Sequence, residues 1–268
     1  MASAIQFLNI LLPVLYACSL MIYMYCFLHP EPPVRKTARL SLWTALVVHL
    51  IYLVLVGLNY HRPPMANFFE ALSFLAFTVG VVYAYLEIRV QEESAGLFIL
   101  IFVFLFQLFS TAYVSHTKEV SELLATRSMA FHIGMSLFSF SALAISAVFG
   151  GMYLMLYYNI KKHQFGLIYN RLPSLERLGR LCYHGALFGF ALLTLGIISG
   201  VVQFAVQTSG ERSQDLKVLL VVITWAIYGV LIYLKMFRGW QGPRIAYFSI
   251  LGFVTTITSL IAAFHLLH

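Results

Sequence analysis

The sequence predicts an all-α membrane protein with about eight transmembrane helices. Three observations support this fold class: 61% of the 268 residues are hydrophobic, only 10% are charged, and long apolar runs alternate with short polar breaks. A helix needs about 20 apolar residues to cross the hydrocarbon of a bilayer. A soluble domain needs far more polar surface than this composition supplies. We therefore expect lipid to surround the whole chain.

Each apolar run is bounded by proline or charge, because proline removes a backbone donor that lipid cannot replace. The first run follows no basic region, so we expect it to stay as a helix. Pro-rich turns close the first two runs, and charged stretches close the others. The predicted helices are 5–28, 40–59, 67–87, 95–114, 128–158, 180–206, 216–236 and 244–266. We expect residues 1–268 to form a single transmembrane domain.

The distribution of basic residues predicts the orientation of the helices. Twelve of the 17 Lys and Arg residues lie in the connections after the first, third, fifth and seventh helices, and five lie in the others. Basic connections stay in the cytoplasm. We therefore expect both termini on the outer side of a bacterial inner membrane. The basic residues form no continuous stripe, which excludes a nucleic-acid partner.

Residues 164–180 indicate a short amphipathic segment on the cytoplasmic surface. Leucines recur there at helical spacing, and Glu176 and Arg180 stand four residues apart. The leucines are Leu172, Leu175, Leu178 and Leu181. The segment is predicted to form its own helix over 172–181.

The nine histidines suggest a haem site near the outer face. His132 lies about 6 Å below the outer start of the fifth helix, at 1.5 Å per residue, and His265 is about as close to the outer end of the eighth. Two imidazoles at matched depth on different helices can ligate one iron axially. The alternative is that each histidine is a solvated or hydrogen-bonded group. Ser128, Ser136 and Ser139 are candidates to orient the ring of His132.

Other residues are secondary candidates for the same cofactor. His61 follows the second helix on the outer side, His49 lies about 15 Å from either end of that helix, and His184 lies near the cytoplasmic face. Gly196 and Gly200 form a flat patch that admits another helix or, as a minority interpretation, a planar cofactor beside Ser136. The sequence lacks a covalent attachment motif, so the haem is expected to be b-type and non-covalent.

Three stretches carry a resemblance to a known family. The first is 60–72, where Asn67 and Glu70 form a capping box at the start of a helix. The second is Ser128-Met129-Ala130-Phe131-His132, and the third runs from 172–178 through 192–200 to 223–228. Together they resemble the haem-handling membrane proteins of the cytochrome c assembly family, in its CcsA-type branch. The resemblance implies that His132 is an external haem ligand.

Two departures point to a particular branch of that family. The tryptophans of the family's haem-presenting loop are replaced, which removes aromatic faces that would stack on a porphyrin; these positions hold Gln203, Thr208, Arg212 and Gln214. Lys235 stands where larger relatives place an intramembrane histidine ligand. The chain is therefore similar to the short HemX-like branch, which implies a role in haem biosynthesis and its regulation, including control of glutamyl-tRNA reductase levels.

These observations leave three functions open. The leading one is a haem-binding protein for haem handling or regulation of haem biosynthesis. One alternative is a haem transporter or synthase component of cytochrome c biogenesis. The other is a non-catalytic partner whose loop 161–180 docks a cytoplasmic haem-biosynthesis enzyme or a membrane protease and so controls that enzyme's abundance. We expect no enzyme activity, because no catalytic constellation is present and Glu70 and Glu87 are expected to be hydrated at the ends of their helix.

Overall fold

The computed structural model describes residues 1–90, 94–114, 127–206 and 215–265, except that side chains at 127–128, 203–206, 215–217 and 263–265 are not described. Eight helices in these ranges are long and apolar enough to cross a membrane. The predicted all-α fold with about eight spanning helices is therefore confirmed. The chain divides into two compact units, Met1–Ala130 (unit 1) and Phe131–His268 (unit 2).

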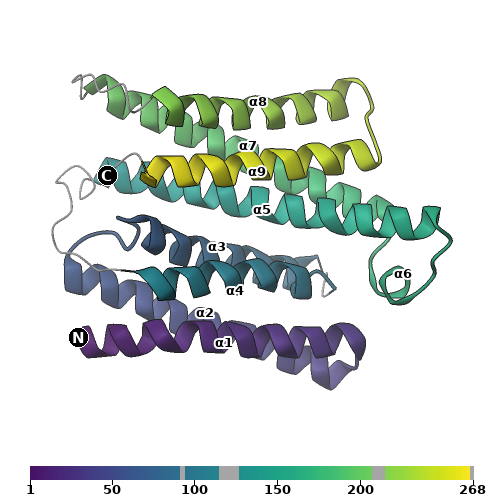
Figure 1. Ribbon diagram of the computed structural model, residues 1–268, viewed down its shortest axis with the longest axis horizontal. Helices are drawn as coiled ribbons and strands as arrows, with labels where there is room; N and C mark the ends of the chain where they lie inside the picture. The colour runs from purple at the N-terminus through teal and green to yellow at the C-terminus, as the bar shows by residue number, and fades with distance from the viewer. Residues whose placement is uncertain (91–93, 115–126, 207–214, 266–268) are drawn as a thin grey trace. The chain divides into compact units, whose positions relative to one another are not determined.

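Unit 1 is a bundle of four antiparallel helices (Figure 1). α1 packs against α2 and α4, and α3 packs against the same two helices, so the four enclose one interior. The helices are α1 (Ala2–Leu28), α2 (Pro32–Tyr60), α3 (Phe68–Arg89) and α4 (Gly96–Tyr113). α1 and α3 end at the same end of this bundle, and the α2–α3 turn lies at the other end.

α2 begins eight residues before its predicted start at residue 40. Pro32 and Pro33 occupy its first turn, where a missing N–H costs no hydrogen bond. The predicted start was wrong because Arg35, Lys36 and Arg39 read as a polar loop. They instead form the first turns of a helix that continues into the apolar run.

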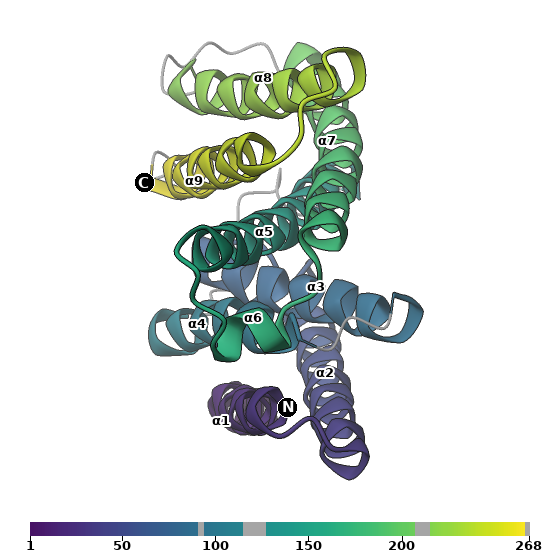
Figure 2. The ribbon, with the colours of Figure 1, turned by 90° about the vertical axis from the view of Figure 1, so that its right-hand side faces the viewer.

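Unit 2 contains four long helices and one short one. α7 packs against α8 and α9, and α8 packs against α9. The helices are α5 (Arg127–Lys161), α6 (Leu167–Arg171), α7 (Leu175–Val206), α8 (Asp215–Phe237) and α9 (Pro243–His265). α6 is a single short helix in the loop that joins α5 to α7 (Figures 1 and 2).

The predicted separate helix over 172–181 is wrong. The chain breaks at Pro173, and α7 then runs without interruption from Leu175 into the membrane span. Leu172 and Leu178 are buried, which joins the start of α7 to the rest of unit 2. α6 is a helix separate from the membrane spans, and none of its residues is buried.

Candidate functional site

His132 on α5 lies against α7 with one ring nitrogen fixed. Its Nδ1 atom is 2.9 Å from the carbonyl oxygen of Gly196 and 3.2 Å from the Ser199 hydroxyl. A carbonyl oxygen only accepts, so Nδ1 carries the proton and donates it. Among the residues that the structure describes, Nε2 has no hydrogen-bond partner. The lone pair of Nε2 is therefore available, and a fixed Nδ1–H is the arrangement found in metal-ligating histidines.

Two glycines of α7 make room for the α5 side chains. A Cβ atom on Gly200 would lie 2.8 Å from Cε1 of His132, and a Cβ atom on Gly196 would lie 3.0 Å from the Ser136 hydroxyl. Any larger residue at Gly200 would displace the imidazole. The flat patch predicted from the sequence thus receives a neighbouring helix, and it also sets where the His132 ring lies.

The group that orients the His132 ring differs from the expected one. Ser136 donates to the backbone carbonyl of His132, and Ser139 donates to the carbonyl of Gly189, so neither hydroxyl contacts the ring nitrogens. Ser128 has no described side chain. The orienting atoms come from the last turns of α7, where Ser199 also donates to the Gly196 carbonyl at 2.8 Å. A backbone carbonyl leaves no signal in a sequence.

His49 is fully buried in unit 1 and both of its ring nitrogens have partners. The Tyr16 hydroxyl lies 2.9 Å from Nδ1, and the Ser73 hydroxyl lies 3.0 Å from Nε2. Ser73 in turn donates to Gln107 at 2.9 Å. One hydrogen-bonded chain therefore crosses all four helices of the bundle. In this arrangement neither nitrogen of His49 is open to iron.

The remaining candidate histidines lie in different surroundings. His61 is exposed and follows α2 in the left-handed conformation, with φ of 53°. His184 is an exposed residue of α7. α9 ends at His265, whose side chain lies outside the described residues. Within the described part of the chain, no group of three His, Cys, Asp or Glu side chains is arranged to hold a metal ion.

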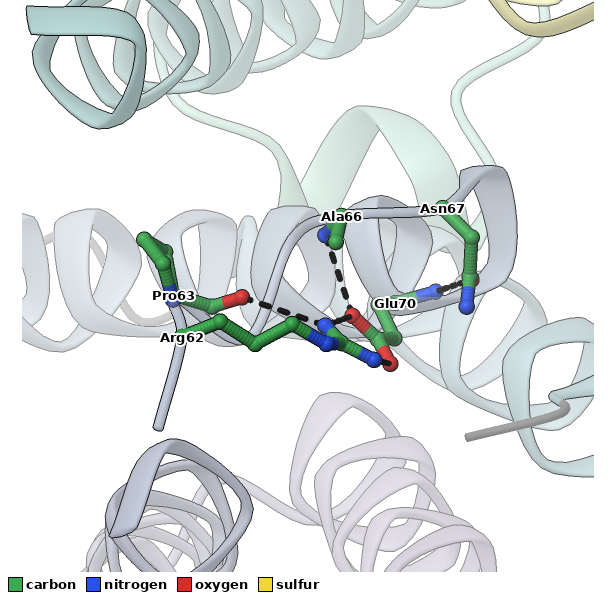
Figure 3. Close-up of polar contacts among 5 residues, drawn as sticks. All are labelled: Arg62, Pro63, Ala66, Asn67 and Glu70. Carbon is green, nitrogen blue, oxygen red and sulfur yellow. Dashed lines mark hydrogen bonds and ion pairs between the residues drawn. The ribbon is translucent and has the colours of Figure 1, made fainter. Parts of the chain in front are cut away.

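The α2–α3 turn beside His61 is held by a buried ion pair (Figure 3). The Arg62 guanidinium donates to the two carboxylate oxygens of Glu70 at 2.6 and 2.8 Å, and the two side chains are 4% and 2% exposed. Glu70 also accepts from the amide of Ala66 at 3.0 Å. Paired, planar contacts of this kind are among the strongest hydrogen bonds in proteins.

The capping box predicted at the start of α3 is present in part. The Asn67 side chain accepts from the Glu70 amide at 2.8 Å, as an N-cap residue does. The Glu70 carboxylate instead turns toward Arg62. The sequence analysis did not single out Arg62, although an arginine and a glutamate on either side of a short turn were the available signal.

Glu87 is a second carboxylate that the sequence wrongly placed in water. Its side chain is 2% exposed, accepts from the Tyr23 hydroxyl at 2.9 Å and lies 3.6 Å from the Arg39 guanidinium. Because Glu70 and Glu87 are both buried beside arginine, α3 is anchored to the α2–α3 turn near its start and to α2 near its end. Interior charges of this kind are costly unless they are paired.

Comparison with known proteins places the chain among its relatives. A family model described as cytochrome C assembly protein matches residues 65–266. The chain belongs to the cytochrome c assembly protein family. The matched region starts in the α2–α3 turn and includes α3, α4 and all helices of unit 2. The resemblance predicted from the sequence is therefore confirmed at the level of the family.

Individual members of the cytochrome c assembly protein family extend over most of the chain. The inner membrane protein YpjD of Escherichia coli (strain K12) is 28% identical over 248 residues, which covers 90% of both chains. The cytochrome c biogenesis protein CcsA of Heterosigma akashiwo is 26% identical over 251 residues, covering 81% of this chain and 78% of the relative. CcsA of Guillardia theta is 27% identical over 210 residues, covering 71% and 70%.

Proposed function

We propose that this membrane protein binds a non-covalent b-type haem, with His132 as one axial ligand, and that it serves haem handling or the regulation of haem biosynthesis. The observation that carries the proposal is the fixed tautomer of His132. Its Nδ1–H bond to the Gly196 carbonyl leaves Nε2 unprotonated, which is the form that ligates iron. Membership of the cytochrome c assembly family supports haem as the group bound.

His265 is our proposed second ligand. α5 begins and α9 ends at the same end of unit 2 (Figure 1), which supports a site formed by these two helix ends. Two histidine ligands would hold the iron in the low-spin state. His61 is the alternative second ligand. Each candidate ligand can be removed by a single substitution, and the spectra of the two variants then distinguish between them.

The test is the visible spectrum of the purified protein before and after reconstitution with haem. We expect a Soret band with the resolved α and β bands of low-spin bis-histidine haem, and a haem content measured as the pyridine haemochrome. His132→Ala should lose these bands. His184→Ala is the matched control, because it removes an exposed histidine of the same unit and should leave the spectrum unchanged. No haem retention in the parent protein contradicts the proposal.

The second ligand is assigned by the same measurement. His265→Ala should convert the spectrum to that of a high-spin, five-coordinate haem, while His61→Ala should not. If instead only His61→Ala changes the spin state, the second ligand is His61. If neither does, the iron has another axial partner and both assignments of the second ligand are wrong.

A second candidate function is a component of haem delivery in cytochrome c biogenesis. The observation that favours it is the name of the CcsA relatives, which are cytochrome c biogenesis proteins. Against it stand the polar residues at the tryptophan positions of the presenting loop: Gln203, Thr208, Arg212 and Gln214. These side chains lie outside the described residues. Complementation of a cytochrome c assembly mutant decides the question, and we expect no holocytochrome to form.

We also propose a bacterial inner membrane as the location. The chain is a multi-pass membrane protein, and one of its relatives, YpjD of Escherichia coli, is named as an inner membrane protein. Fractionation of cells that express a tagged form, with proteolysis of intact spheroplasts, would place both the protein and its termini. We expect a tag at either terminus to be cleaved from the outside.

A further inference from the structure

The connection between α5 and α7 carries an unusual combination of exposed side chains. Phe165, Leu167 and Tyr169 are 55%, 47% and 41% exposed, and the rings of Phe165 and Tyr169 pack edge to face at 4.9 Å. In water, three adjacent large apolar side chains would stay unfavourably hydrated. At the level of lipid headgroups the same side chains are favoured, because aromatic rings and leucine can enter the interface there.

Basic residues flank these three side chains in the sequence. Over residues 161–180, which we call the basic connection, five Lys or Arg residues stand against a single acidic one, Glu176. The five are Lys161, Lys162, Arg171, Arg177 and Arg180. Glu176 is itself within 3.9 Å of Arg180 at the surface. The basic connection is therefore a segment with a strong excess of positive charge and exposed apolar side chains in its first half.

The position of the basic connection keeps it close to the bilayer. One membrane span ends at Lys161 and the next begins at Leu175, so 13 residues join two span ends. Buried Leu172 and Leu178 hold the second half of the connection to the bundle, whereas α6 has no buried residue. Its exposed face is thus presented at the membrane boundary.

We propose that the basic connection binds the headgroups of anionic phospholipids, with Phe165, Leu167 and Tyr169 inserted between the lipids and the lysines and arginines paired with phosphate. Charge complementarity selects anionic over zwitterionic lipid, because each Lys or Arg near an anionic membrane surface is attracted to it. This interaction is independent of haem binding and fixes where unit 2 meets the membrane surface.

The experiment places a reporter in the connection. Full-length Tyr169→Trp protein is reconstituted in vesicles that contain brominated phosphatidylglycerol or, at equal mole fraction, brominated phosphatidylcholine. The parent protein has three tryptophans, so its emission is subtracted from that of the variant. Quenching of the remaining emission, which comes from the new tryptophan, is then measured. We expect the anionic lipid to quench it at least about threefold more strongly, a difference that one basic residue suffices to produce. A Phe165→Trp variant serves as a second reporter.

Substitutions assign the preference to the basic residues. Lys161→Gln/Lys162→Gln should reduce the quenching ratio toward one, while Arg35→Gln/Lys36→Gln, a matched exposed pair at the start of α2, should leave it unchanged. Equal quenching by both lipids would overturn the proposal, because it shows insertion without recognition of charge. Absence of quenching by either lipid would also overturn it and would leave the connection free for a protein partner.

Discussion

The two units hold their helices together by different means. Unit 1 buries two carboxylates, Glu70 and Glu87, and a histidine, and each of them contacts side chains from outside its own helix. In the described part of unit 2, the buried polar side chains other than tyrosine and cysteine are all serine or threonine. Its glycines allow close approach instead: a Cβ atom on Gly189 would lie 2.4 Å from a Leu143 methyl carbon.

The two histidines inside the helix bundles differ in the same way. His49 is one link in a satisfied hydrogen-bond chain, so its chemistry is used to hold four helices together. His132 lies in the unit that relies on small residues, where a backbone carbonyl fixes one nitrogen and no described residue hydrogen-bonds to the other. A buried histidine therefore becomes a ligand candidate only when its neighbours leave a nitrogen available.

The largest expected effect comes from breaking the ion pair of unit 1. Arg62→Met leaves the buried Glu70 carboxylate without its guanidinium and should lower the free energy of unfolding by about 3–5 kcal/mol. SDS titration of the protein in mixed micelles measures this quantity. Arg62→Met/Glu70→Leu should recover most of the loss, since an apolar pair of similar volume is often neutral. A full loss in the double variant would mean that the pair is not the source of the effect.

A glycine substitution tests the close approach in unit 2 at the His132 ring. Gly200→Ala would place Cβ 2.8 Å from Cε1 of His132 and should displace the imidazole, weakening haem affinity about 10–100-fold, as loss of an orienting contact does. Haem titration followed at the Soret band measures it. Gly134→Ala on α5 is the control, because its Cβ meets nothing within 4 Å. Equal affinities for both variants would contradict this role of Gly200.

Substitution of the buried His49 tests whether this histidine of unit 1 contributes to stability and not to haem binding. His49→Leu leaves the hydroxyls of Tyr16 and Ser73 without a common partner and should lower the free energy of unfolding by about 2 kcal/mol. The haem spectrum should stay that of the parent protein. A lost Soret band in a folded His49→Leu protein would transfer the ligand role to unit 1.

The smallest expected effect is at the cap of α3. Asn67→Ala removes the acceptor for the Glu70 amide and should cost about 1 kcal/mol of unfolding free energy. Asn67→Ser, which retains a capping oxygen, is the matched control and should stay within a few tenths of a kcal/mol of the parent protein. A larger loss in Asn67→Ala would mean that the cap also holds the Arg62–Glu70 pair in place.

The features of the fold and of the site that the sequence predicted are local ones. Eight spans follow from the lengths of the apolar runs, and the Asn67 cap follows from a spacing of three residues. The close approach of another helix at Gly196 and Gly200 could also be predicted, because small residues four apart on a membrane helix are typical of close helix–helix packing. Each of these depends on residues of one continuous segment of the chain.

The parts that the sequence did not predict depend on distant atoms or on the backbone. The Arg62–Glu70 contact requires the α2–α3 turn to fold back on itself, and the Arg39–Glu87 contact joins residues 48 positions apart. The Gly196 group that orients His132 is a backbone carbonyl, and every residue type has one. Charges near a predicted helix end were read as hydrated, although here they are paired inside the bundle.

The most direct test of the central claim is ligand replacement at His132. His132→Gly opens a space in place of the imidazole, and added imidazole can then occupy the same coordination position. We predict that this variant loses the low-spin haem spectrum and that millimolar imidazole restores it, while His184→Gly retains it throughout. A His132→Gly protein that shows the parent spectrum without imidazole would contradict the assignment of His132 as an axial ligand.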